Sequence, residues 1–236
     1  MKIACWSGPR NISSALMRSW SSRDDTFVTD EPFYAYYLKE TQKKHPMREK
    51  IINQYPSDYN EIVNYLINDV PSQKNIWYQK HMAHHLIDLS NIDWIKEFKN
   101  CILLRHPREV INSFTAKNNL NNVWELGYPQ QLEIAKFLKK SNQSFMIIDS
   151  EDLLKNPKKI LFDWCQRINI KFDESMLHWE KGSHPNDGIW GQHWYNNLIE
   201  TTGFQEYQKI DISIENKYDS VYNDSMEYYT YLKSFQ

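Results

Sequence analysis

The sequence predicts a three-layer α/β/α fold around a central parallel sheet of about five strands. Short apolar runs are typical of buried strands, and each is followed by polar or turn residues and then by apolar residues at helical spacing. Strands that alternate with helices pair in parallel, and the connecting helices cover both faces of the sheet. The apolar runs occupy residues 3–6, 26–29, 75–79, 101–104 and 144–148.

The helical stretches between these runs have recognisable starts and a period near 3.6 residues. One helix is expected to begin near Ser13, and Pro107 stands at the favoured first position of another. Further helices are expected at residues 59–70, 130–140 and 157–168. From about residue 180 the chain is aromatic and polar without a clear period, which predicts loops and short helices over the sheet edge.

Length and composition predict one domain over residues 1–236, with a core at about 1–180 and an aromatic cover at about 181–236. The net charge of −2 argues against nucleic acid or an anionic membrane as a partner. No apolar run is long enough to span a membrane or to form a signal peptide. The three cysteines are far apart, which fits reduced thiols in a cytoplasmic protein. No metal-ligand spacing is present, so no metal is expected, and no pattern indicates an oligomeric state.

The loop after the first predicted strand, SGPRNISS at residues 7–14, combines bending residues, an arginine and short hydroxyl or amide side chains. In an open α/β sheet, ligands bind beyond the carboxyl ends of the strands. A helix start at that edge offers free N–H groups and the positive end of the helix dipole to an anion. Arg10 adds a planar cation that suits phosphate or sulfate oxygens. The alternative is an ordinary capped helix with Arg10 in a surface ion pair.

This loop differs from the nucleotide-binding pattern G-x-x-x-x-G-K-[ST], because neither a second glycine nor a Lys-Ser/Thr pair follows Gly8. It resembles instead the 5′-phosphosulfate-binding loop of the sulfotransferase family, which runs Pro, Lys or Arg, a small polar residue, Gly and two hydroxyl residues. Position 12 departs from that pattern, since the family usually has glycine there. The matching stretch is Pro9-Arg10-Asn11-Ile12-Ser13-Ser14.

Two later stretches extend the resemblance. In CILLRHPREVINSF (residues 101–114), Arg105 ends a strand and Ser113 follows about two helical turns into the next helix, which is similar to the 3′-phosphate motif of the family. The stretch at 180–204, with Lys181, Gly182 and a Gly-x-Trp, looks like the late loop that closes over the nucleotide. The resemblance covers residues 2–204.

Membership of that family implies a P-loop nucleotide-hydrolase-like fold and 3′-phosphoadenosine-5′-phosphosulfate as donor, which leaves adenosine 3′,5′-bisphosphate as product. The reaction would transfer a sulfuryl group to a hydroxyl or amine of a small-molecule or glycan acceptor, without a metal. Arg10, with the N–H groups around Ser13 and Ser14, would neutralise charge on the leaving oxygen. The 3′-phosphate would be held by Arg105 and Ser113.

A general base should take the proton of the acceptor. Glu31 follows the second predicted strand, and some family members use a glutamate in a comparable place. His81 follows the third, where other members use a histidine, although here it directly follows Lys80. We favour Glu31, keep His81 as the alternative, and expect Lys80 to steady the transferring group.

Aromatic side chains could line an acceptor pocket or stack on the adenine, although packing alone would also explain them. Two further functions stay open at this point. A P-loop small-molecule kinase would depend on Mg²⁺ and ATP, and a non-catalytic protein of the same fold would bind the nucleotide without transfer. The aromatic candidates are Tyr34, Tyr36, Tyr37, Trp190, Trp194 and Tyr195.

Overall fold

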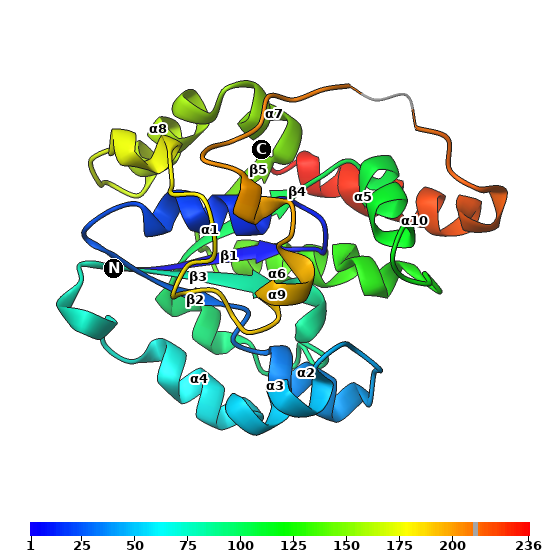
Figure 1. Ribbon diagram of the computed structural model, residues 1–236, viewed down its shortest axis with the longest axis horizontal. Coiled ribbons are helices and arrows are strands. Elements are labelled where there is room, and N and C mark those ends of the chain that lie inside the picture. Colours follow the sequence, from blue (N-terminus) through cyan, green and yellow to red (C-terminus); the bar gives the residue numbers. More distant parts are fainter. Residues whose placement is uncertain (210–211) are drawn as a thin grey trace.

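The computed structural model describes residues 1–209 and 212–236, and it contains the predicted parallel sheet (Figure 1). The strand order is β2-β3-β1-β4-β5, and every neighbouring pair is parallel. The α/β prediction with five parallel strands is therefore confirmed. The strands are β1 (Lys2–Ser7), β2 (Thr26–Asp30), β3 (Ile76–Met82), β4 (Lys99–Leu104) and β5 (Phe145–Asp149).

The helices follow the strands in the expected alternation, with short 3-10 helices in several connections. Within residues 1–209 and 212–236, no helix is long and apolar enough to cross a membrane. The α-helices are α1 (Ser13–Ser21), α2 (Tyr34–Thr41), α3 (Arg48–Gln54), α4 (Tyr59–Ile67), α5 (Pro107–Thr115), α6 (Tyr128–Lys140), α7 (Ser150–Lys155), α8 (Pro157–Arg167), α9 (Gly191–Trp194) and α10 (Asp219–Lys233).

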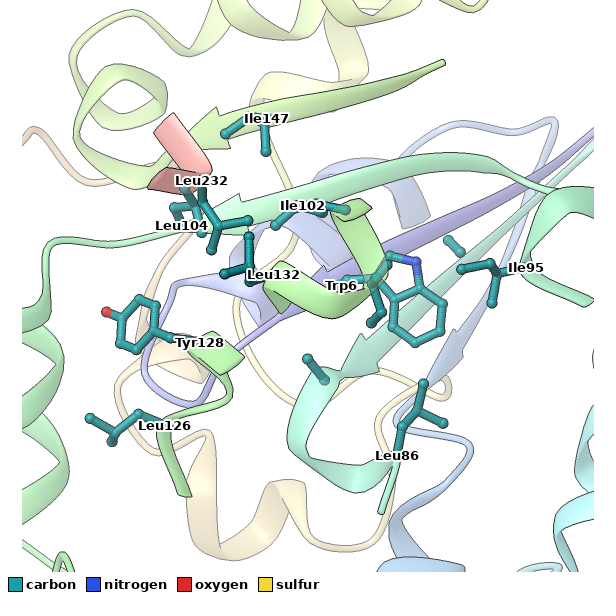
Figure 2. Packing of buried hydrophobic residues seen from close by; sticks show 14 of the residues in the cluster. Trp6, Leu86, Ile95, Ile102, Leu104, Leu126, Tyr128, Leu132, Ile147 and Leu232 are labelled. Atoms are coloured by element: carbon teal, nitrogen blue, oxygen red, sulfur yellow. The ribbon is translucent and has the colours of Figure 1, made fainter. Parts of the chain in front are cut away.

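Two hydrophobic clusters, one on each face of the sheet, produce the three layers. Side chains alternate along a strand, so Ile3 of β1 packs with α1 and α8 in one cluster, whereas Trp6 belongs to the other. Figure 2 shows this second cluster, in which Trp6, Ile102 and Leu132 lie between the sheet and α6. β1 is buried on both faces, as its uninterrupted apolar run predicts.

The tail differs from its prediction in one element. Residues 181–204 form loops and short helices, but α10 is a 15-residue helix that packs against α5 and α6. Its buried positions Val221, Ser225, Tyr229 and Leu232 follow helical spacing, and serine and tyrosine among them weaken the apolar signal in the sequence.

The third strand continues beyond its predicted end at residue 79. β3 runs to Met82 and includes Lys80 and His81, both almost completely buried. Because consecutive strand side chains point to opposite faces, Lys80 and His81 cannot serve the same site.

The connections that follow the neighbouring strands β1 and β4 leave the sheet on opposite faces. The loop after β1 leads to α1 on one face, and the loop after β4 leads to α5 in the cluster on the other face. Neighbouring strands whose connections leave to opposite faces open a crevice at their carboxyl ends, which is where ligands bind in such sheets.

Candidate active site

A cleft of about 760 Å³ lies at the carboxyl ends of the strands and receives both arginines of the predicted anion sites. The loop at residues 9–15 lines it together with Arg105 and Ser113, and Glu31 and Lys80 lie on its wall. The predicted residues of the two phosphate motifs therefore share one cavity. A nucleotide with phosphates on both sides of its ribose needs this proximity.

The loop after β1 presents an open helix start to the cleft. The residue before α1, Ile12, has a left-handed backbone (φ 58°), and no side chain in the described part of the chain caps this helix. Its first N–H groups are therefore available to a ligand. Asn11 anchors the loop, because its Nδ2 donates to the carbonyl oxygen of Leu103 at 3.1 Å. At Gly8, a Cβ would stand 2.2 Å from the carbonyl oxygen of Leu126, so this position admits only glycine.

Arg10 and Arg105 form a compact cationic group with Ser113. Arg10 Nε donates to Ser113 Oγ at 2.8 Å, and Arg105 Nη1 donates to the carbonyl oxygen of Arg10 at 2.7 Å. Arg105 Nε also pairs with Glu109 at 2.8 Å. Burial, and then the charge of Arg105, lower the pKa of Arg10. Two guanidinium groups held this closely favour an anion between them.

Glu31 stands at the end of β2 in a strained backbone conformation (φ 43°). Its N–H donates to the carbonyl oxygen of Lys80 at 2.9 Å, and its own carbonyl accepts from the N–H of Tyr34 at 3.0 Å, which together hold this conformation. Its side chain accepts from Lys80 Nζ at 2.5 Å. Burial raises the pKa of Glu31 to about 7, Lys80 opposes this effect and Asp30 adds to it. A carboxyl with this pKa can exchange a proton near neutrality.

The segment at residues 182–195 crosses the sheet end and is held there by two carboxylates, its own Asp187 and the buried Asp30 of β2. Arg18 of α1 pairs with Asp187 at 2.6 Å and donates to the carbonyl oxygen of Gly182 at 3.3 Å. Asp30 accepts from Trp190 Nε1 at 3.1 Å and from the hydroxyl of Tyr195 at 2.7 Å. In Figure 1 the segment is coloured yellow to orange and contains α9.

His81 lies away from the cleft. Its ring stacks on Trp6 with centroids 4.3 Å apart, its Nε2 is 3.1 Å from Gln79 Oε1, and burial lowers its pKa to about 3. The physical reason is the longer β3, which directs Lys80 into the cleft and its neighbour to the opposite face.

Lys181 and Gly182 also lie outside the residues that line the cleft. Lys181 is exposed and pairs with Glu200 at the surface, and Gly182 bonds to Arg18 and Ile199. The Arg18–Asp187 pair draws this part of the late segment against α1. The sequence showed no partner for these residues, because Arg18 lies more than 160 positions away.

Another part of the cleft wall is aromatic, and the ion pair of Lys43 with Glu125, at 2.9 Å, lines the same cleft. The ring of His85 is stacked between Tyr34 and Tyr37, with centroids 4.8 and 4.7 Å apart. The Tyr34 hydroxyl is hydrogen-bonded to His45 Nδ1 at 2.6 Å, and burial lowers the pKa of His45 to about 4 and that of His84 to about 3. Among residues 1–209 and 212–236, no three His, Cys, Asp or Glu side chains could together hold a metal. Of the aromatic candidates, Tyr34, Tyr37, Trp194 and Tyr195 line the cleft, whereas Tyr36 and Trp190 do not.

Comparison with protein families and curated sequences agrees with this geometry. The profile of a family described as "Sulfotransferase domain" matches residues 1–236. Two Arabidopsis thaliana proteins, branched-chain-amino-acid aminotransferase-like proteins 2 and 1, are 35% and 31% identical over 208 and 232 residues. These matches cover 88% and 98% of this chain but only 37% and 41% of the two relatives.

Solved structures with the same fold include three sulfotransferases. The sulfotransferase domain of the Synechococcus PCC 7002 olefin synthase aligns with a TM-score of 0.58 at 17% identity, covering 99% of this chain and 94% of that one. The sulfotransferase domain from the curacin biosynthetic pathway aligns at 0.55 and 15%, covering 98% and 96%. The sulfotransferase from Alicyclobacillus acidocaldarius aligns at 0.55 and 10%, covering 98% and 94%. At these identities the likeness shows the fold alone.

Proposed function

Because this chain belongs to the sulfotransferase domain family, we propose that it transfers a sulfuryl group from 3′-phosphoadenosine-5′-phosphosulfate to a hydroxyl or amine of a small-molecule or glycan acceptor. The observation that carries the proposal is the shared cleft, in which Arg10, Arg105 and Ser113 lie with Glu31 and Lys80. The chain spans about two fifths of its curated relatives, so the proposal concerns this domain.

The cleft fits an anionic donor. It offers two guanidinium groups, the hydroxyl of Ser113 and the open start of α1, all of which favour negative charge. We assign Ser13, Ser14 and the α1 N–H groups to the 5′ side of the nucleotide, together with the rest of the loop at residues 8–14. Arg105 and Ser113 bind the 3′-phosphate, and Arg10, bonded to Ser113, lies between the two sides. The donor supplies the activated sulfuryl group.

Glu31 acts as the base in this proposal. With its pKa raised to about 7, it can accept the acceptor's proton near neutral pH as the new S–O or S–N bond forms and the bond from sulfur to the leaving oxygen of the donor breaks. Lys80, 2.5 Å from Glu31, acts on the transferring group through its positive charge, and Arg10 offsets the charge that develops on the leaving oxygen. The aromatic part of the wall with Tyr34 and Tyr37 faces the acceptor.

A binding experiment with three nucleotides tests the donor assignment. Because a ligand that binds only the folded state raises its melting temperature, adenosine 3′,5′-bisphosphate should raise Tm more than AMP does. Arg10→Ala should remove most of this rise. Lys155→Ala is the matched control, since Lys155 is exposed and lies outside this cleft. A larger Tm rise with ATP and Mg²⁺ would support a kinase instead, and equal binding by Arg10→Ala would refute the role of this residue.

Transfer itself is measured with donor labelled in the sulfuryl group and a panel of phenols, sugars and amines. We expect label in at least one acceptor, lost in Glu31→Gln. Tight binding of adenosine 3′,5′-bisphosphate without transfer to any acceptor would favour a non-catalytic nucleotide-binding protein.

A further inference from the structure

Lys80 is shared between two carboxylates of unequal exposure. Its Nζ donates to Asp30 Oδ1 at 2.8 Å, to Glu31 Oε1 at 2.5 Å and to the hydroxyl of Tyr195 at 2.8 Å. An ammonium has three protons, so these contacts use its full capacity. Glu31 lines the cleft, whereas Asp30 is buried behind it.

Asp30 is the centre of the arrangement. Besides Lys80, it accepts from the N–H of Gly188 and from Trp190 Nε1, both at 3.1 Å, and from the Tyr195 hydroxyl at 2.7 Å. Tyr195 therefore accepts from Lys80 and donates to Asp30, which closes a triangle of three hydrogen bonds. The parallel register of β2 and β3 places residue 30 directly opposite residue 80, so strand pairing itself brings the carboxylate of Asp30 close to the ammonium of Lys80.

Resting on the proposed function, we propose that Asp30 is a positioning residue for the acid–base pair. It shares the ammonium of Lys80 with Glu31 and links this pair through Tyr195 to the late segment at residues 182–195. Neither Asp30 nor the Tyr195 hydroxyl needs to touch the donor or the acceptor for this role.

The charge count explains the consequence. One ammonium faces two carboxylates, so the cluster carries a net charge of −1 when Glu31 is ionised and 0 when it is protonated. Asp30 therefore makes the Glu31 carboxylate more ready to take a proton, and without Asp30 the full charge of Lys80 would stabilise ionised Glu31.

Other charged and titratable groups face this cluster. Asp187 of the late segment is neutralised by Arg18 of α1 at 2.6 Å. Tyr34 faces Glu31 from α2, and burial raises its pKa, so it stays uncharged at neutral pH. The imidazole groups after β3, His84 and His85, have lowered pKa values because they are buried, and they stay neutral as well. Asp30 is thus the negative charge that competes for Lys80.

The test follows the titration of the Glu31 carboxyl directly by carbon NMR, with Glu31→Gln to assign the signal. In Asp30→Asn, the midpoint should fall by one pH unit or more from its value near 7. Asp187→Asn is the matched control, since this carboxylate pairs with Arg18 rather than Lys80. The shift of the Glu31 midpoint in Asp187→Asn should stay below about a third of the shift in Asp30→Asn. If Asp30→Asn does not fold, Tyr195→Phe removes only the hydroxyl and should shift the midpoint in the same direction by less.

A second measurement uses the transfer reaction. The acid limb of the pH profile of kcat/KM should move with the NMR midpoint, while the KM for the donor stays within about twofold, because Asp30 lies outside the cleft. Midpoints of Glu31 that stay unchanged in both Asp30→Asn and Tyr195→Phe would overturn the inference. If the Glu31 midpoint shifts as expected but the protein shows no transfer activity, the inference about Asp30 stands and only the proposed function is refuted.

Discussion

Replacing Glu31 with glutamine should stabilise the protein at neutral pH although it removes an ion pair. Burial raises the pKa of Glu31 from 4.5 to about 7, so ionising this group costs more in the folded state than in the unfolded state. The difference is about 2.5 pH units, and at about 1.4 kcal/mol per unit it corresponds to a cost of about 3 kcal/mol.

The sign follows from proton binding. Below pH 4.5, Glu31 is protonated in both states and contributes no difference. Between pH 4.5 and 7 the unfolded state loses its proton first, so wild-type stability falls, and above pH 7 the full cost is present. Glutamine does not titrate, so the free energy of unfolding of Glu31→Gln, relative to that of wild type, should rise by about 3 kcal/mol between pH 4.5 and pH 8.

Urea unfolding followed by tryptophan fluorescence measures this difference at each pH, and subtraction of the two proteins cancels every other titrating group. Glu125→Gln is the matched control. Burial raises the pKa of Glu125, but its 2.9 Å pair with Lys43 and its bonds to Asn121 lower it overall to below 4.5, so Glu125 is ionised in both states above that pH and the difference between this variant and wild type should stay nearly constant up to pH 8. A constant difference between wild type and Glu31→Gln across this pH range would refute the reasoning.

Four more substitutions test other contacts. Arg105→Ala should weaken binding of adenosine 3′,5′-bisphosphate about 10- to 100-fold while leaving AMP nearly unaffected in calorimetry, because only the 3′-phosphate loses a charged partner. Ile12→Gly should change the free energy of unfolding by less than about 1 kcal/mol, because glycine adopts the left-handed backbone at φ 58° without strain and this gain offsets the lost packing. A loss of stability above about 3 kcal/mol would show that the backbone of Ile12 is unstrained. Arg18→Met should cost about 3 kcal/mol in urea unfolding, because Asp187 loses its buried partner; the expectation fails if stability is unchanged. His81→Phe should retain transfer and its pH profile, since the ring stacks on Trp6 and bonds to Gln79 outside the cleft, and loss of the acid limb would restore His81 as the base.

The candidate site shows which of its residues could be placed at the cleft from the sequence alone. Arg10 and Arg105 were identified because each lies within three residues of the end of a buried strand, and parallel strands align their carboxyl ends at one edge of a sheet. Glu31 was found by the same logic. Asp30 was missed, although its neighbour was chosen, because the sequence does not show that Lys80 lies opposite it.

His81 and Lys181 show the limit of the same reasoning. Whether a residue belongs to a strand decides which face its side chain meets, and the buried polar residues Lys80 and His81 hid the continuation of β3 beyond residue 79. Lys181 matched a family pattern by order alone, while its position depends on how Arg18 and Asp187 dock the late segment.

Periodicity and strand-end chemistry were enough to determine a parallel α/β sheet with two arginine-bearing loops at one edge, because both are local properties of the chain. Tertiary structure alone decided the partners of Lys80, the raised pKa of Glu31 and the course of residues 182–195. These features depend on burial and on contacts between residues 49 to 169 positions apart, and desolvation acts only once those residues have been brought together.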